Sequence, residues 1–127
     1  MKFNLQKEEK YAVLASDVEK LDSLNAPDLK SELVYLAKNS HRNIIVDLSA
    51  TRYCDSSGLS ALLTGNRLAK EQDGTFVLCG LQPAVEKLVK ISQLTSVFNI
   101  VPSKDEAIDM VMMEEIEREL KEEGGDS

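Results

Sequence analysis

The sequence predicts an α/β fold with a mostly parallel sheet of about five strands, an antiparallel amino-terminal edge and about four helices. The segments IIVDL at 44–48 and TFVLCG at 75–80 are almost wholly apolar, as in strands that are covered on both faces of a parallel sheet. From residue 11 onward, such segments alternate with stretches of helical spacing, which favours right-handed crossovers between parallel strands. The 127 residues suit one domain with its own core.

The first forty residues predict two antiparallel strands and a helix. FNLQ at 3–6 and YAVLASDV at 11–18 flank the charged turn KEEK. Asn25 can cap a helix that has Pro27 in its first turn and runs to about Lys38. Its apolar positions recur at helical spacing and form one face to bury: Leu29, Leu33, Leu36 and Ala37.

Two further helices and strands follow the central strand. After the loop 49–58, helical spacing continues to the turn at Gln72-Asp73-Gly74. The apolar or packed positions of that helix are Leu59, Leu62, Leu63, Asn66 and Ala69. Pro83 opens another helical pattern with Ala84, Leu88 and Ile91, and SVFNIV at 96–101 predicts the last strand.

The final helix is expected to begin after Ser103. Glu106 stands three residues further on, which is the spacing of a capping box. The stripe that we expect this helix to bury consists of Ile108, Val111, Met112, Ile116 and Leu120.

Negative charge is concentrated at the carboxyl-terminal end of the chain. Residues 114–127 contain seven acidic and two basic residues, a net charge of 2 − 7 = −5 out of the total of −7. We expect a single domain over 1–113, followed by the acidic end of the last helix and a disordered tail over 114–127. The remainder carries only about −2 and has no basic stripe, so nucleic acid is not an expected partner.

Neither a membrane span nor a signal sequence is predicted. The chain has no apolar run of the length that a bilayer requires, and its opening MKFNLQKEEKY has no apolar region. We therefore expect a cytoplasmic protein with no direct membrane insertion. Cys54 and Cys79 lie in apolar stretches and are predicted to be buried free thiols.

The sequence also lacks the usual signatures of an enzyme. His41 is the single histidine and stands in the polar connector KNSHRN, so no catalytic triad is available. DSSG is not the G-x-S-x-G elbow of hydrolases, and the nucleotide-binding pattern G-x-x-x-x-G-K-[ST] is absent. We expect no catalytic residue, no metal site and no cofactor.

The stretch YCDSSGLSALL at 53–63 places a polar cluster between a predicted strand and a helix. Asp55 or Ser56 can cap the helix, and Gly58 permits close approach of another backbone or a ligand. Sites of α/β proteins also gather at such strand ends, so a simple cap and a functional site both remain open.

The helix after DSSG has a small, mildly apolar outward face by its spacing: Ser60, Ala61, Thr64 and Leu68. This face is either an ordinary solvated surface or a patch that a partner covers. Gly65 within the same helix indicates either close backbone approach or a tolerated surface glycine.

Nearly the whole chain, from Tyr11 to Ile108, resembles the STAS domain of bacterial anti-sigma factor antagonists. The resemblance lies in IIVDLSATRYCDSSGLSALL, in the later G-x-x-P-x-V motif of GLQPAV, and in LDSLNAPDLKSEL upstream. It implies that the unphosphorylated protein binds an anti-sigma factor serine kinase and so releases a sigma factor. The phosphorylated residue corresponds to Ser57, and a PP2C-type phosphatase would remove the phosphate. The resemblance also places Asp22 near the partner surface, although a loop or cap role is equally open.

Charge explains how such a switch could act. A phosphoserine adds about −1.5 to −2 charge, which the exposed amides and the dipole at a helix amino end tolerate. The disruption would then fall on the partner. Two alternatives remain: a STAS partner subunit of a lipid-transport ATPase, and a small-anion or nucleotide-binding module that uses the same helix end.

Overall fold

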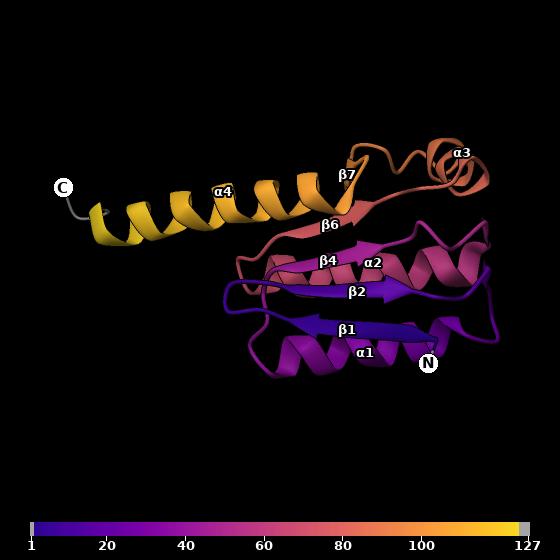
Figure 1. Ribbon diagram of the computed structural model, residues 1–127, viewed down its shortest axis with the longest axis horizontal. Helices are drawn as coiled ribbons and strands as arrows, with labels where there is room; N and C mark the ends of the chain where they lie inside the picture. The colour runs from indigo at the N-terminus through magenta and orange to yellow at the C-terminus, as the bar shows by residue number, and fades with distance from the viewer. Residues whose placement is uncertain (1, 125–127) are drawn as a thin grey trace.

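The computed structural model describes residues 2–124 and has a five-stranded main sheet with four helices (Figure 1). The strands of the main sheet lie in the order β1 (Phe3–Lys7), β2 (Ala12–Ser16), β4 (Ile44–Asp47), β6 (Phe76–Cys79) and β7 (Asn99–Val101). The helices are α1 (Ala26–Lys38), α2 (Ser56–Glu71), α3 (Pro83–Ile91) and α4 (Lys104–Gly124). The last three residues of the predicted disordered tail lie outside the described residues.

The strand directions agree with the prediction. β1 runs antiparallel to β2, with Leu5 opposite Leu14, and the other pairs of the main sheet are parallel. β4 is the central strand, and Ile44, Ile45 and Val46 are buried. The apolar run IIVDL therefore occupies the position that its composition predicted.

A second, two-stranded parallel sheet was not predicted. It pairs β3 (Lys20–Leu21) with β5 (Tyr53–Cys54), neither of which the sequence predicted as a strand. Strands of two residues contain too few positions to show alternation, so the pairing depends on the surrounding fold.

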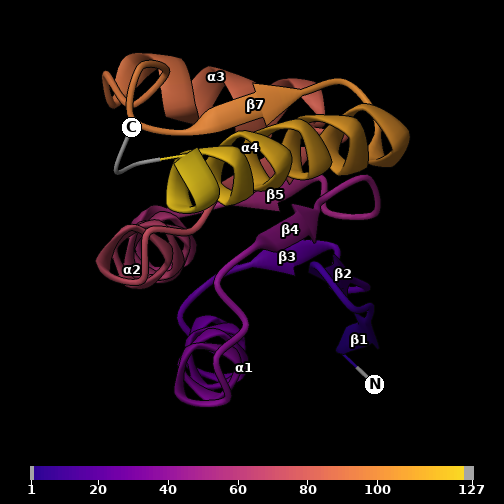
Figure 2. The same ribbon diagram turned by 90° about the vertical axis from the view of Figure 1, so that its left-hand side faces the viewer.

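Helices cover both faces of the main sheet (Figure 2). α1 and α2 lie on one face and pack against each other over the larger core. α4 lies on the other face, where Ala107 and Val111 pack with Val13, Ile45 and Val77. The strands therefore have apolar side chains on both sides.

Gly65 lies where α2 approaches both the sheet and α1 closely. A Cβ atom added there would stand 2.6 Å from Cε1 of Phe76 and 2.9 Å from Cδ1 of Leu33. Of the two interpretations left open for this glycine, the structure supports close approach.

The prediction that Asn25 caps α1 through its side chain is wrong. Asn25 occupies the cap position, but its Oδ1 accepts from the amide of Asp22 at 3.0 Å and its Nδ2 donates to the carbonyl of Lys20 at 2.7 Å. The side chain thus orders the preceding loop. The sequence shows that Asn25 is a residue type that favours caps. The fold places backbone groups of Lys20 and Asp22 within reach of its side chain, which bonds them instead.

The buried residues of α3 are only partly those of the helical pattern that the sequence showed. Val85 and Val89 are buried and Leu88 packs against the core, whereas Ala84 is exposed and Ile91 retains 68% of its accessible surface. The last predicted strand is shorter than expected because 94–98 form a turn, with the amides of Val97 and Phe98 bonded to the carbonyl of Leu94.

Ser103 caps α4, as its spacing predicted. Its Oγ accepts from the amide of Glu106 at 3.2 Å and donates to the Glu106 carboxylate at 3.0 Å. The glutamate thus bonds the cap hydroxyl itself, which differs from the return bond to the cap amide in a standard capping box.

The predicted buried stripe of α4 is wrong over its second half. Ile116 and Leu120 are 48% and 63% exposed, whereas Ala107, Val111 and Glu115 face the sheet. Residues spaced by four drift about 40° round a helix at each step, so a row that begins inward at Ile108 turns outward within three steps.

The second half of α4 instead contacts the rest of the domain through a charged network centred on Glu115. Arg42 donates to both carboxylate oxygens of Glu115, at 3.2 and 2.9 Å, and Arg118 donates to Oε1 at 2.8 Å. Asn43 also donates to Oε1, at 2.9 Å. The domain boundary expected at 113 falls within α4, and both Glu115 and Arg118 lie beyond it.

Candidate functional site

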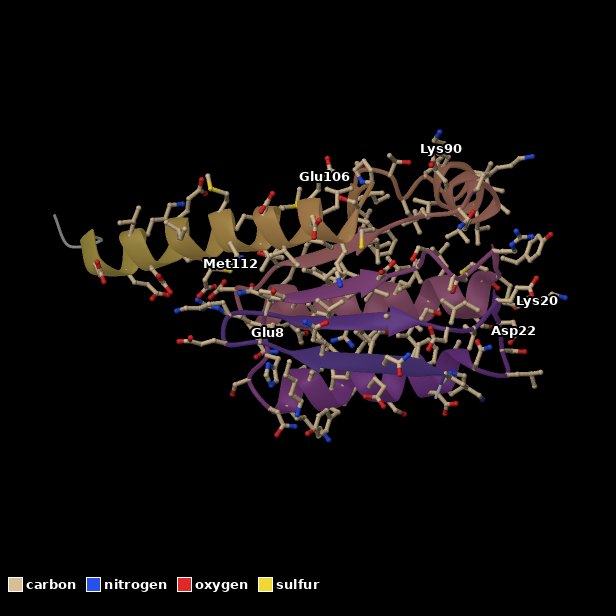
Figure 3. All side chains as sticks on the ribbon, in the orientation of Figure 1. Glu8, Lys20, Asp22, Lys90, Glu106 and Met112 are labelled. Carbon is tan, nitrogen blue, oxygen red and sulfur yellow. The ribbon has the colours of Figure 1, made fainter. Side chains whose placement is uncertain are left out.

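The small sheet of β3 and β5 joins the two loops that contain the predicted site. The amide of Asp55 donates to the carbonyl of Leu21 at 3.1 Å, which places the loop that begins at Asp22 beside the start of α2. Both loops lie at the end of the molecule where β2, β4 and β6 finish, near the labelled Lys20 and Asp22 (Figure 3). The site is therefore at the carboxyl edge of the sheet, where sites of α/β proteins gather.

Asp55 is the cap of α2. Its backbone is extended, and its Oδ1 accepts from the amides of Ser57 and Gly58 at 2.8 and 3.1 Å. Of the two predicted caps, Asp55 or Ser56, the structure uses Asp55. Two amides that we expected to be open to an added phosphate are thus already bonded to a carboxylate.

Gly58 allows the first turn of α2 to lie directly against β3. An added Cβ would stand 2.6 Å from the carbonyl oxygen of Leu21 and 2.8 Å from Sγ of Cys54. The close approach predicted for this glycine is therefore made by the chain itself. Gly58 is buried and shapes the site without presenting a side chain.

An open groove of about 510 Å³ separates the amino ends of α1 and α2. Ser57 lines it and is half-buried, and the neighbouring Ser56 and Ser60 are exposed. The wall from α1 includes Ala26, Pro27 and Lys30, and Ser23 lies at its end. Sequence reasoning missed Lys30, because spacing along α1 does not show which helix it faces.

The outward direction predicted for Ala61 is wrong. This alanine is only 4% exposed and lines the groove at its side toward α1. Spacing alone did not reveal how closely α1 packs on α2. Thr64 and Leu68 lie further along α2 and are half-buried, and the Thr64 hydroxyl donates to the carbonyl of Ser60 at 3.1 Å.

Asp22 orders the loop before α1. Its carbonyl accepts from the amides of Asn25 and Ala26, at 3.2 and 2.8 Å, and its Oδ1 accepts from the amide of Leu24 at 3.0 Å. The loop role foreseen for Asp22 is therefore present. Its half-buried side chain also stands next to Leu21, on the same edge as Asp55.

Two large apolar side chains flank the site. Leu24 is 83% exposed in the loop before α1, and Tyr53 is 52% exposed on β5. Sequence reasoning missed both. A leucine inside the polar segment LDSLNA was the one available signal, and it is weak because single exposed apolar residues are common on protein surfaces.

The loop before Asp55 is held by buried hydrogen bonds. Thr51 is fully buried, and its hydroxyl lies 2.7 Å from both the Ser16 hydroxyl and the carbonyl of Val18. At the end of β4, the Asp47 carboxylate accepts from the amide and hydroxyl of Ser49, at 3.0 and 2.8 Å. These bonds order the segment between β4 and β5, which leads to Asp55.

The cysteines do not form an activated centre. Both thiols are free, Cys79 is buried and Cys54 is half-buried, which confirms the prediction for Cys79 and confirms it in part for Cys54. Burial, reinforced by Asp55 beside Cys54 and Asp47 beside Cys79, raises the pKa of each thiol to about 12. A thiol with this pKa is a poor nucleophile at neutral pH.

His41 lies far from this edge. It is half-buried and lines a small pocket with Lys10, Arg42 and Glu115, beside the amino end of β4. Within residues 2–124, no group of three or more His, Cys, Asp or Glu side chains could hold a metal ion. None of the helices in that range combines the length and hydropathy needed to cross a membrane.

Comparison with known proteins identifies the family. The family model of the STAS domain matches residues 4–107. BtrV of Bordetella bronchiseptica strain RB50, named as a candidate anti-sigma factor antagonist, is 31% identical over 87 residues, which cover 68% of this chain and 75% of BtrV. The chain belongs to the STAS domain family.

Solved structures share the fold. An anti-sigma factor antagonist STAS domain protein from Planctomyces limnophilus superposes with a TM-score of 0.79 at 18% identity, covering 87% of this chain and 97% of that one. The Bacillus cell fate determinant SpoIIAA in its phosphorylated form superposes with a TM-score of 0.68 at 22% identity, covering 86% and 98%. These likenesses confirm the predicted STAS-like α/β architecture.

Proposed function

We propose that this protein is an anti-sigma factor antagonist whose unphosphorylated form binds an anti-sigma factor serine kinase and thereby releases a sigma factor. Membership of the STAS family and the likeness to BtrV support this class of function. In this proposal phosphorylation of Ser57 ends the complex, and a PP2C-type phosphatase restores it. The protein is the substrate of these enzymes, acts in the cytoplasm and has no catalytic residue of its own.

The observation that carries the proposal is the position of Ser57 at the open end of α2. Its side chain lines a groove, and its backbone is held by Asp55 at 2.8 Å. A kinase needs a hydroxyl that it can reach and that holds one position while the phosphoryl group transfers. A half-buried serine on a capped helix meets both needs.

The charges around Ser57 suit a switch that acts mainly on the partner. A phosphoryl group would stand two residues from the Asp55 carboxylate, whose bonds to the Ser57 and Gly58 amides make these donors unavailable. Lys30 lines the same groove and supplies a nearby positive charge. A partner surface that fits the free hydroxyl would meet new bulk and charge, and a loss of about 3 kcal/mol lowers affinity more than a hundredfold.

The proposed partner surface surrounds the groove. Its polar members are Asp22, Asp55, Ser56, Ser57 and Ser60, and Thr64 and Leu68 continue it along α2. Leu24 and Tyr53 add two exposed large side chains, and tyrosine is among the residues that often carry much of the energy in protein interfaces. Gly58 and Ala61, which we also placed in this surface from sequence, contribute through backbone shape.

The experiment that tests the proposal uses the full chain, its cognate anti-sigma factor kinase and ATP. We expect one phosphate on Ser57 by mass spectrometry, and loss of the complex on size-exclusion chromatography in step with phosphorylation. The Ser56→Ala variant should still take one phosphate on Ser57, because the neighbouring serine is not the acceptor. A complex that survives full phosphorylation of Ser57 would refute the switch.

The groove also supports a second candidate function, a small-anion or nucleotide-binding module. Four serines and Lys30 line a cavity at a helix amino end. This candidate predicts a thermal shift with phosphate or a nucleotide that Lys30→Ala abolishes, and no dependence on a kinase. The antagonist function predicts that such ligands leave the melting temperature unchanged.

A further inference from the structure

The outer face of α4 carries a stripe of large apolar side chains without a covering element among the described residues. Met113, Ile116 and Leu120 are 60%, 48% and 63% exposed, and we call these three the α4 stripe. They recur at intervals of three and four residues, so they form one continuous line along the helix. Met112 is half-buried and borders this line.

The α4 stripe cannot turn inward, because the opposite side of the helix is fixed. Glu115 is 7% exposed and bonds Arg42, Asn43 and Arg118, and Val111 packs on the sheet. A second bond ties Lys10 to Glu119 at 2.6 Å. The orientation of α4 is thus set by contacts that leave Ile116 and Leu120 outside.

The α4 stripe is separate from the groove around Ser57. Figure 1 shows the carboxyl-terminal half of α4 extending beyond the sheet at the end opposite to the arrowheads of β2, β4 and β6. Ala107 and Val111 hold the first half of α4 on the face opposite to α1 and α2, and Figure 2 shows its carboxyl-terminal half crossing the end of the sheet. The groove lies at the amino ends of α1 and α2, at the other end of the sheet. A partner on this stripe would leave the proposed kinase surface open.

Acidic residues dominate the surroundings of the α4 stripe. Asp109 and Glu123 lie on the same line at its two ends, and Glu117 lies beside it between Met113 and Leu120. All three are exposed. From Lys104 to Glu123 the exposed charged residues of α4 are six acids (Asp105, Glu106, Asp109, Glu117, Glu122, Glu123) and two lysines (Lys104, Lys121).

We propose that the α4 stripe is a docking surface for a basic amphipathic helix of a protein partner. A helix that presents apolar side chains at intervals of three and four fits between Met113, Ile116 and Leu120 by the helix-on-helix packing of coiled coils. Lys or Arg on its flanks would meet Asp109, Glu117 and Glu123. A second copy of the same face would place acid against acid, and an anionic membrane would be repelled in the same way.

The test uses the full chain and a synthetic amphipathic peptide of about 18 residues, with leucines at helical spacing and lysines on both flanks. We expect binding with a Kd near 10 μM by isothermal titration calorimetry. The Ile116→Gln/Leu120→Gln variant should weaken binding at least about tenfold. Ile91→Gln is the matched control, since Ile91 is also an exposed isoleucine but lies on α3, and it should leave the Kd unchanged.

Further experiments distinguish a basic amphipathic helix from other possible occupants of the α4 stripe. A peptide of the same composition in scrambled order should bind at least about tenfold more weakly, and Glu117→Lys should weaken binding of the ordered peptide. Equal binding of the scrambled peptide, or an unchanged Kd in Ile116→Gln/Leu120→Gln, would overturn the proposal. So would a dimer in sedimentation equilibrium that this variant dissociates, or stripe-dependent binding to phosphatidylglycerol vesicles.

Discussion

The Asp55 carboxylate holds the backbone amide of Ser57 at 2.8 Å, so the acid of the DSSG stretch fixes the serine two residues after it. The same oxygen caps α2 and stands beside the proposed phosphorylation site. Stability of the helix start and electrostatics of the switch therefore share one side chain. A substitution that keeps a capping oxygen but removes the charge, such as Asp55→Ser, separates the two roles.

Asp55→Ala should destabilise the protein by removing the cap. Loss of a cap costs about 1 kcal/mol, which lowers the melting temperature by a few degrees in a domain of this size. Asp55→Ser keeps a capping oxygen and is expected to retain most of the stability. Thermal unfolding followed by circular dichroism distinguishes them, and equal melting temperatures for Asp55→Ala and wild type would contradict the cap.

Ser57→Asp should weaken binding to the anti-sigma factor kinase, because it adds a negative charge at the groove next to Asp55. We expect a fall in affinity of a hundredfold or more, measured by isothermal titration calorimetry. Ser57→Ala removes only a hydroxyl and should bind within a few-fold of wild type while resisting phosphorylation. Tight binding by Ser57→Asp would rule out charge as the cause of release.

Gly58→Ala should lower the free energy of unfolding through steric overlap. The new methyl group would meet the carbonyl oxygen of Leu21 at 2.6 Å, and such overpacking typically costs about 1–3 kcal/mol. Ser60→Ala, on the exposed side of the same helix, is the control and should change stability by less than about 0.5 kcal/mol. Urea unfolding measures the free energy of unfolding of both variants. A Gly58→Ala variant as stable as wild type would show that β3 shifts to accommodate the methyl group.

Acid should remove the contribution of Glu115 to stability. Burial alone would raise the pKa of this carboxyl, but hydrogen bonds from Arg42, Asn43 and Arg118 and the charge of Arg42 lower the pKa from 4.5 to about 2. A group whose pKa is lower in the folded state stabilises the fold above its unfolded pKa, and this contribution is lost as pH falls from about 4.5 toward 2. It amounts to about 3 kcal/mol at neutral pH.

Glu115→Gln is the variant that isolates this effect. At pH 7 it should be about 3 kcal/mol less stable than wild type, since Arg42 and Arg118 lose their counter-charge, and the difference should shrink below about pH 4. Glu122→Gln is the control, because Glu122 is exposed and lies 4.0 Å from Arg42. Urea unfolding at several pH values measures the difference. A pH-independent difference would mean that Glu115 acts by packing alone.

Cys54 and Cys79 should react slowly with iodoacetamide in the native protein. Their pKa values of about 12 leave almost no thiolate at pH 7. We expect labelling at least about a hundredfold slower than in urea, with Cys79 slower than Cys54 because it is fully buried. Mass spectrometry of timed samples measures each rate, and fast native labelling of Cys79 would show that β6 opens locally.

The order of strands and helices was predictable because it depends on local composition. IIVDL and TFVLCG are apolar on both faces, and only a central position in a parallel sheet buries both. The DSSG stretch was placed at the amino end of a helix by the same means, although the strand directly before it is the two-residue β5 and β4 ends at Asp47. Asp55 as a cap follows from chemistry that acts over two or three residues.

Residues that meet across long sequence separations were not predictable. Glu115 bonds Arg42, which is 73 positions away, and Lys30 shares a groove with Ser57. Residue spacing shows which side chains share one face of a helix, but it does not show which other element packs against that face. For the same reason Ala61 was placed outside and proved to be buried between α2 and α1.

By itself the sequence determined the α/β class, the central place of β4 and the position of the DSSG stretch at a strand end, since each follows from periodicity and capping chemistry among near neighbours. Tertiary structure decided which side of α4 faces the sheet. Val111 packs inward, and a residue five positions later lies about 140° further round the helix, so Ile116 is carried to the surface. The ion pairs at Glu115 then hold that orientation, and they exist only once α4 has met the start of β4.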